Sequence, residues 1–202
     1  MRSNDRIQLY HFERCPYCEK VRRVFRALNL NYESHLIEPD DRRKVEEVSG
    51  QENVPVIIDG ETVVNESTDI AGYLDEYYSD GVRIIPESPE DRGLVYVLDR
   101  YADNVLSSVT YRALVNIDED GEPLDTEGKE ALQRGIDCEA DYMNQMLTNR
   151  SFLVGVSLSL ADISVSAFLS RLTDITDFTP DRSYAQLWKW YRRIEDQLNE
   201  TS

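Results

Sequence analysis

Two of the three cysteines of this chain stand close together, in the segment CPYC at residues 15–18. Such a pair can form a reactive dithiol, supply half of a metal site or close a structural disulfide. A structural disulfide is disfavoured because closing so short a loop stabilises a fold only slightly. A zinc site needs a closed set of ligands, and only Cys138 and the two histidines remain to complete one, so we expect no metal. The pattern therefore favours a reactive dithiol.

Cys15 is the expected nucleophile of this dithiol. At the first turn of a helix its sulfur would face unpaired backbone N–H groups and the positive end of the helix dipole, and both favour the reactive thiolate. Arg14 and Lys20 add positive charge nearby in a chain that is otherwise acidic. Cys18 lies one turn deeper, so we expect it to be less exposed and to act as the resolving thiol. Tyr17 is expected to shape the surroundings of the thiol.

The residues around the dithiol predict a strand followed by a helix. Residues 7–12 (IQLYHF) are rich in aliphatic and aromatic side chains, which is typical of a strand. After them, apolar residues recur at the spacing of one helical face and predict a helix over residues 16–28. Pro16 fits the first turn of that helix, where its missing N–H costs least. We expect His11 and His35, in or beside strands, to have packing or surface roles.

The sequence continues in the pattern of a small mixed sheet. Residues 32–37 predict a second strand, and residues 40–48 predict a charged helix that Gly50 closes. A strand, a helix and a strand in succession indicate a parallel pair with a right-handed crossover. Two apolar runs around Asp-Gly at residues 59–60 predict an antiparallel hairpin, and a helix over residues 67–78 follows. The expected order is βαβ followed by ββα.

The second half of the chain shows helical periods only. Residues 81–88 have the composition of a linker and predict a boundary between a domain at residues 1–80 and a domain at residues 89–202. Cys138 falls on one of the expected helices, where we predict a small buried side chain rather than a reactive group. The expected helices cover residues 89–113, 129–147 and 159–172, and a last one carries Leu187, Trp190, Tyr191, Ile194 and Leu198.

The charge of the chain excludes one class of partner and suggests an environment. Its 39 acidic and 22 basic residues give a net charge of −17, which would repel nucleic acid. No apolar segment is long enough for a signal sequence or a membrane span, so we expect a cytoplasmic protein without membrane attachment. Thiols are mostly kept reduced in the cytoplasm, which agrees with a redox dithiol. The acidity suggests either a high-salt cytoplasm of a halophile or an ordinary acidic protein.

Three motifs in sequence order resemble the thioredoxin-like half of glutaredoxins and glutathione transferases. They are CPYC at a helix start, NVPVI at residues 53–57 and NESTDI at residues 65–70. The resemblance implies an α/β thioredoxin-like fold for the N-terminal domain. It also implies a cis peptide bond at Pro55, placed beside the reactive cysteine.

The same resemblance implies which residues bind a thiol substrate. The backbone of Val54 would pair with the cysteinyl part of glutathione, and Glu66 and Ser67 would bind the γ-glutamyl end. The chemistry is reasonable because Glu66 can pair with an α-ammonium while Ser67 and helix-start N–H groups hold an α-carboxylate. The alternative is that Ser67 is a helix N-cap and Glu66 a surface acid.

The second half resembles the helical domain of the transferases. The segment FLVGVSLSLADISVSAFLSRL at residues 152–172 carries Ser159 and Asp162 in a Ser-x-x-Asp capping box that opens a buried helix. This pair has a folding role. The whole chain is most similar to the two-domain glutaredoxins, in which an all-α transferase-like domain follows the thioredoxin-like domain.

The leading functional hypothesis is a thiol–disulfide oxidoreductase. It would reduce disulfides of proteins or small molecules with glutathione or γ-glutamylcysteine as co-substrate, without a tightly bound cofactor, and as a monomer or a homodimer. A second hypothesis is a conjugating glutathione transferase, for which Tyr10 would be the candidate group. A third is a non-catalytic binding module with a transferase-like fold.

Overall fold

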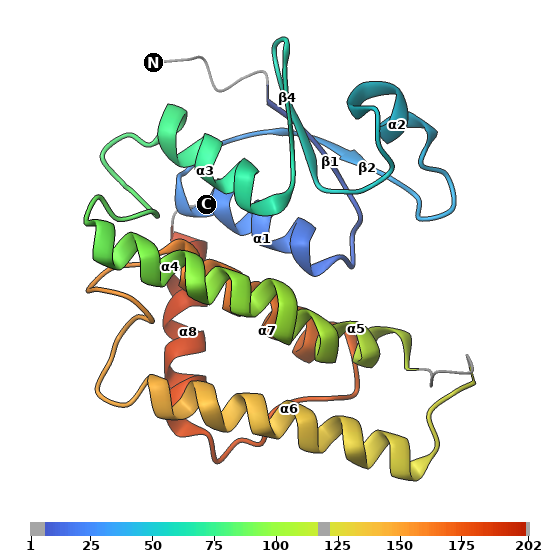
Figure 1. Ribbon diagram of the computed structural model, residues 1–202, viewed down its shortest axis with the longest axis vertical. Helices are drawn as coiled ribbons and strands as arrows, with labels where there is room; N and C mark the ends of the chain where they lie inside the picture. The colour runs from blue at the N-terminus through green and yellow to red at the C-terminus, as the bar shows by residue number, and fades with distance from the viewer. Residues whose placement is uncertain (1–6, 117–121, 201–202) are drawn as a thin grey trace.

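A four-stranded sheet with helices on both faces forms the first half of the chain (Figure 1). The computed structural model describes residues 7–116 and 122–200. The strands lie in the order β2-β1-β3-β4, with β2 parallel to β1 and the two other pairs antiparallel. The predicted crossover and the predicted hairpin are therefore both present. The strands are β1 (Ile7–His11), β2 (Glu33–Leu36), β3 (Val56–Asp59) and β4 (Thr62–Asn65).

The helices of this half cover opposite faces of the sheet. Helices α1 (Pro16–Ala27) and α3 (Ser67–Tyr78) lie on the face toward the helical half, and α2 (Arg43–Ser49) covers the other face (Figure 1). Strand β1 alternates between the two faces, as a strand buried on both sides must. Leu9 packs in the large core with α1 and α3, and Tyr10 packs with α2.

Helix α2 begins later than the sequence predicts, but Gly50 closes it as predicted. The first residues of the expected helix 40–48 form a turn, and α2 begins at Arg43. Gly50 follows the helix in the left-handed conformation at φ 72°, and its N–H donates to the carbonyl of Glu46 at 2.8 Å. Glycine is favoured there because this conformation costs it no steric strain.

The second half consists of helices around a buried central helix. The predicted helix 89–113 is present, but a π-helical turn, η1, interrupts it. Among the described residues no helix is long and apolar enough to cross a membrane. The elements of this half are α4 (Pro89–Tyr101), η1 (Ala102–Leu106), α5 (Ser107–Val115), α6 (Thr126–Met146), α7 (Leu160–Ile175) and α8 (Ala185–Glu200).

A buried polar cluster fixes the start of α7, the central helix of this half. Ser159 and Asp162 form the capping box that the sequence predicts, with Ser159 N–H donating to Oδ2 of Asp162 at 3.1 Å. The other carboxylate oxygen accepts hydrogen bonds from the N–H of Leu153 and from Nε1 of Trp190, each at 2.8 Å. Asp162 thus joins the start of α7 to the loop before it and to α8.

The segment expected to be a linker is packed against both halves. Ile84 and Ile85 are buried in the large core. The N–H of Ile84 donates to Asp75 of α3 at 2.7 Å, and its carbonyl accepts from Leu160 of α7 at 2.8 Å. The connection therefore fixes α3 and α7 relative to each other.

Buried ion pairs cross the boundary between the two halves. Lys20 of α1 is fully buried and its Nζ lies 2.5 Å from Asp99 and 3.1 Å from Asp103, on α4 and η1. Arg23, one turn away, is 2% exposed and its Nη1 lies 2.5 Å from Glu195 of α8. Since removing one member of such a pair leaves a buried charge uncompensated, these contacts orient α1 against the helical half.

We predict that Lys20→Met destabilises the whole protein. The substitution leaves the buried Asp99 and the half-buried Asp103 without their shared cation, and loss of one member of a buried pair costs about 3 to 5 kcal/mol. Urea unfolding followed by circular dichroism measures the change in the free energy of unfolding. Arg43→Met removes a cation from an exposed pair with Asp41 and is the control, expected to leave stability unchanged. Equal stability of wild type and Lys20→Met would contradict the prediction.

Candidate active site

Cys15 is the residue before the first turn of α1, where the sequence places it. Its φ and ψ of −69° and 125° are those of an N-cap, and its Sγ accepts a hydrogen bond from the N–H of Cys18 at 3.5 Å. Pro16 follows at the first helical position and has no N–H to offer. Cys15 is partly exposed and Cys18 is fully buried, which is the arrangement expected of a nucleophile and a resolving thiol.

The two sulfurs differ in how readily they ionise. A hydrogen bond from the Cys18 side chain, joined by N–H groups of Cys18 and Tyr17 and by the charge of Arg22, lowers the pKa of Cys15 to about 7 against the effect of burial. Burial raises the pKa of Cys18 well above its ordinary value, and the neighbouring Cys15 adds to the rise. The shared proton therefore stays on Cys18 and leaves a thiolate at Cys15.

Lys20 is one of the two basic residues that were expected to support Cys15. Its ammonium is bound inside the protein by Asp99, Asp103 and the hydroxyl of Thr68. These partners were not predicted, because an ion pair with residues far along the chain cannot be read from local spacing, and the support of Cys15 by Lys20 stays a prediction.

Two other basic residues, Arg14 and Arg22, border the dithiol or act on it through their charge. Arg14 is exposed and lines the cavity into which Cys15 opens. Arg22 was missed, although its position four residues after Cys18 places both side chains on one face of α1. This helical spacing is the signal that could have found it.

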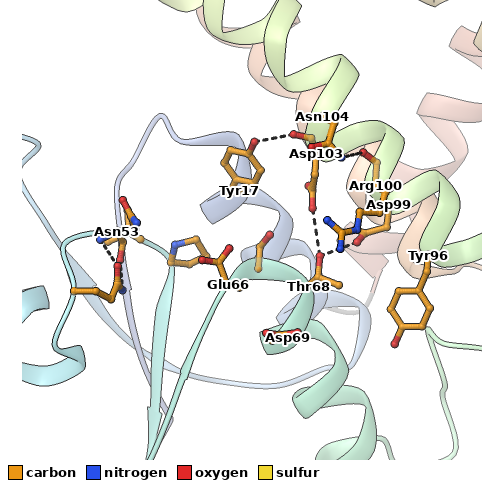
Figure 2. A pocket seen from close by; sticks show the side chains of 14 residues that line it. Tyr17, Asn53, Glu66, Thr68, Asp69, Tyr96, Asp99, Arg100, Asp103 and Asn104 are labelled. Carbon is orange, nitrogen blue, oxygen red and sulfur yellow. Dashed lines mark hydrogen bonds between the residues drawn. The ribbon is translucent and has the colours of Figure 1, made fainter.

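A cavity of about 700 Å³, here called the interdomain cavity, lies between the two halves, and Tyr17 of the CPYC segment lines it (Figure 2). All four residues that the family resemblance assigns to thiol binding line it, and Val54–Pro55 is a cis peptide bond as that resemblance implies. The opposite wall comes from α4 and η1 and was not predicted, because it depends on how the two halves pack. The residues are Val54, Pro55, Glu66 and Ser67 on one side and Tyr96, Asp99, Arg100, Asp103 and Asn104 on the other.

The start of α3 presents polar groups to this cavity. Glu66 is the N-cap of α3, with a positive φ of 65°, and its side chain is exposed and makes no capping hydrogen bond. Ser67 is buried as the first residue of the helix. The alternative that Ser67 is the N-cap is therefore wrong. The free N–H groups of the first turn suit an anion such as an α-carboxylate.

A second cavity of about 800 Å³, here called the apolar cavity, opens on the other side of the dithiol. Cys15 lies at its edge beside the charged side chains of Glu13 and Arg14. Its lining is mostly apolar and comes from both halves of the chain. The apolar lining residues are Phe12, Pro16, Leu36, Ile37, Pro39, Tyr111, Leu114 and Val115.

Tyr17 lines both cavities and is held from the helical half. Its hydroxyl donates to the carbonyl of Asp103 in the π-helical turn at 2.9 Å (Figure 2). Its ring meets Phe168 of α7 edge to face, with the ring centroids 5.3 Å apart. Turns of π-helix are frequent at functional sites because they change which groups a helix presents. Tyr17 is consequently a fixed wall between the two cavities.

The remaining candidate residues lie away from the cavities. Tyr10, the candidate group of the transferase hypothesis, is buried and stacks on His35 with ring centroids 4.6 Å apart, so it has a packing role. His11 is also buried, against Ser34 and Arg22. Within residues 7–116 and 122–200, no group of three or more His, Cys, Asp or Glu side chains is placed to hold a metal ion.

The prediction for Cys138 was wrong. This residue is exposed, whereas the sequence analysis expected it to be buried. The buried face of α6 is set by Leu132, Ile136, Ala140 and Met143, and the helical spacing leaves Cys138 off that face.

Comparison with known proteins identifies the architecture. Sequence models of the glutathione S-transferase N-terminal domain and C-terminal domain match residues 9–82 and 111–199, which together are most of the chain. The chain belongs to the glutathione S-transferase family. A solved glutathione S-transferase from Rhodospirillum rubrum F11 has the same fold, with a TM-score of 0.84 at 22% identity over 96% of this chain and 91% of that chain.

Curated relatives of this glutathione S-transferase family member fall in two groups. Glutaredoxin 2 of Escherichia coli K12 is 30% identical over 50% of this chain, and the match spans only 47% of that protein. Glutathione S-transferase U13 of Arabidopsis thaliana is 25% identical over 96% of this chain and 88% of that protein. The chain therefore spans about half the length of the glutaredoxin in this match and nearly all of the plant transferase.

We predict that alkylation of Cys15 by iodoacetamide follows a titration with a midpoint near pH 7. At that pH about half of the Cys15 thiol is ionised, against about 3% for a cysteine with the ordinary pKa, so the rate should rise through pH 7 and level off above it. Peptide mass spectrometry separates Cys15 from Cys18 and Cys138. Cys18→Ala serves as the matched variant, since loss of the side-chain donor that bonds to Cys15 should move the midpoint upward. A wild-type midpoint above pH 8 would refute the prediction.

Proposed function

We propose that this glutathione S-transferase family member is a cytoplasmic thiol–disulfide oxidoreductase of the glutaredoxin type. The observation that carries the proposal is the unequal dithiol, in which a partly exposed sulfur at the start of α1 has a lowered pKa and a buried sulfur beside it has a raised pKa and keeps its proton. A thiolate attacks disulfides, whereas a thiol does not. The relation to Glutaredoxin 2 supports the same conclusion.

The dithiol reduces a disulfide in two steps. The Cys15 thiolate attacks one sulfur of the substrate disulfide, forms a mixed disulfide and expels the other substrate sulfur as a thiolate. Cys18 then loses its proton to that thiolate and attacks Cys15, which releases the second substrate thiol and leaves a Cys15–Cys18 disulfide. The second substrate sulfur leaves as a thiolate and takes its proton from water, so the substrate gains two electrons and one proton from the dithiol and a second proton from solvent. The substrates are disulfides of proteins or small molecules.

A γ-glutamyl thiol returns the dithiol to its reduced state. One thiolate attacks Cys15, forms a mixed disulfide and frees Cys18, and a second thiolate attacks the bound thiol and leaves as a symmetrical disulfide. In the interdomain cavity, Val54 meets the cysteinyl backbone and Glu66 and Ser67 hold the γ-glutamyl end. Glutathione and γ-glutamylcysteine share these groups, so either is a co-substrate, and no tightly bound cofactor is required.

A second candidate function is conjugation of the thiol to an electrophile. The apolar cavity beside Cys15 favours it, because its lining can accept an apolar second substrate. Tyr10 is not available to activate a thiol, since it is buried against His35. Parallel assays with a chromogenic electrophile and with a small mixed disulfide separate the two functions.

We predict that Cys15→Ser abolishes reduction of a glutathione mixed disulfide, while Cys18→Ser keeps activity by a monothiol route. The reason is that glutathione can resolve the mixed disulfide at Cys15 when Cys18 is absent, but nothing replaces the attacking sulfur. A coupled assay of glutathione disulfide formation measures both variants. Cys138→Ser is the control and should equal wild type. Equal residual activity in Cys15→Ser and Cys18→Ser would rule out this division of roles.

We also predict that Glu66→Gln raises the KM for the thiol roughly tenfold or more, with a smaller change in kcat. Losing a hydrogen bond to a charged group costs about 1.5 to 3 kcal/mol, and the α-ammonium would be its partner. Steady-state kinetics over a range of glutathione concentrations give the two constants. Glu61→Gln removes a charge from the hairpin outside the cavity and should leave KM unchanged. The same KM in all three proteins would contradict the assignment of Glu66.

A further inference from the structure

Arg22 clamps the loop that leads from β1 into the dithiol. It lies on α1 one turn after Cys18, and its side chain is 15% exposed. Its Nη1 donates to the carbonyl of Phe12 at 3.1 Å and its Nη2 donates to the carbonyl of Glu13 at 2.9 Å. Phe12 and Glu13 directly precede Arg14 and Cys15 in the chain. The guanidinium thus fixes the backbone that delivers the sulfur to the helix start.

Two side chains hold the guanidinium itself in place. Its Nε donates to Glu19 at 2.9 Å, and Nη1 lies 2.9 Å from Nδ1 of His11. An arginine can only donate, so Nδ1 is an acceptor and the proton of the neutral ring is on Nε2, which bonds to Ser34 at 2.8 Å. Burial and the charge of Arg22 lower the pKa of His11, in agreement with a neutral ring.

The other charged groups near the dithiol are exposed or bound elsewhere. Arg14 and Glu13 are exposed on the preceding loop, and Lys20 is bound by Asp99 and Asp103. Glu19 forms ion pairs with four arginines of α1 and α7, so its charge is compensated. Those arginines are Arg22, Arg23, Arg26 and Arg171.

We propose that Arg22 is the positioning residue of the dithiol: its planar guanidinium fixes the loop at residues 12–14 and sets one fixed positive charge behind Cys15 and Cys18. The inference rests on the proposed reactivity of the dithiol and adds a residue to it. A guanidinium suits this task because its fork spans two carbonyls and an imidazole at once. The same charge acts on both sulfurs.

Arg22→Gln tests the proposal through the pH profile of Cys15 alkylation. The midpoint should move upward by about one pH unit, which lowers the alkylation rate at pH 7 about fivefold. Arg26→Gln is the matched control, because Arg26 lies on the same helix and shares Glu19 but does not reach the loop. It should keep the wild-type midpoint. A folded Arg22→Gln protein with the wild-type midpoint overturns the proposal, and so does an equal shift in Arg26→Gln.

Arg22→Lys keeps the test decisive if Arg22→Gln does not fold. Lysine retains the charge and loses the fork, so the midpoint should move less than half a pH unit, while amide hydrogen exchange at residues 12–15 should become faster. If amide exchange at residues 12–15 of Arg22→Lys stayed as slow as in wild type, the proposal that Arg22 fixes this loop would be overturned. Alkylation needs no disulfide substrate, so a failed disulfide assay with a shifted midpoint would reject the proposed function and keep the role of Arg22.

Discussion

The proposed activity depends on holding one sulfur at the start of α1. A thiolate there is stabilised by the groups around the helix start, and each of those groups needs its own support. The loop before Cys15 is bound by Arg22, and the wall beside it is Tyr17, bound to the carbonyl of Asp103. The far side of α1 is fixed by the ion pair of Lys20 inside the protein. Reactivity at the surface therefore rests on buried contacts one and two turns away.

The helical half contributes to the site as well as to stability. Asp103 of the π-helical turn accepts from Lys20 and from Thr68, so it contacts α1 and the start of α3 together (Figure 2). Those two helices carry the reactive sulfur and the proposed thiol-binding groups. Tyr17 lines a polar cavity and an apolar cavity, and Cys15 lies at the edge of the apolar one. Under the proposed function, the polar cavity would hold the γ-glutamyl thiol and the apolar cavity would admit the second substrate.

The local features of the fold could be predicted from the sequence, and the features that join distant residues could not. Cys15 at the helix start and the hairpin at residues 59–60 are set by neighbours in the chain, and both were found. The bond of Lys20 to Asp99 joins residues far apart in the sequence, so local spacing did not show it. The residues of the π-helical turn have the same kinds of side chain as a regular α-helix. Residues 89–113 were therefore predicted as one regular helix. Cys138 was misplaced although the helical spacing of Leu132, Ile136, Ala140 and Met143 already leaves it off the buried face of α6.

The most direct test of the account is to trap the mixed disulfide. Reduced Cys18→Ser protein, mixed with glutathione disulfide and digested at low pH, shows by peptide mass spectrometry which sulfur carries the thiol. The account predicts a glutathione adduct on Cys15 that a second glutathione removes, with Glu66→Gln slowing its formation. An adduct on the exposed Cys138 alone, or none at all, would contradict the claim that the ionised sulfur at the start of α1 receives a γ-glutamyl thiol.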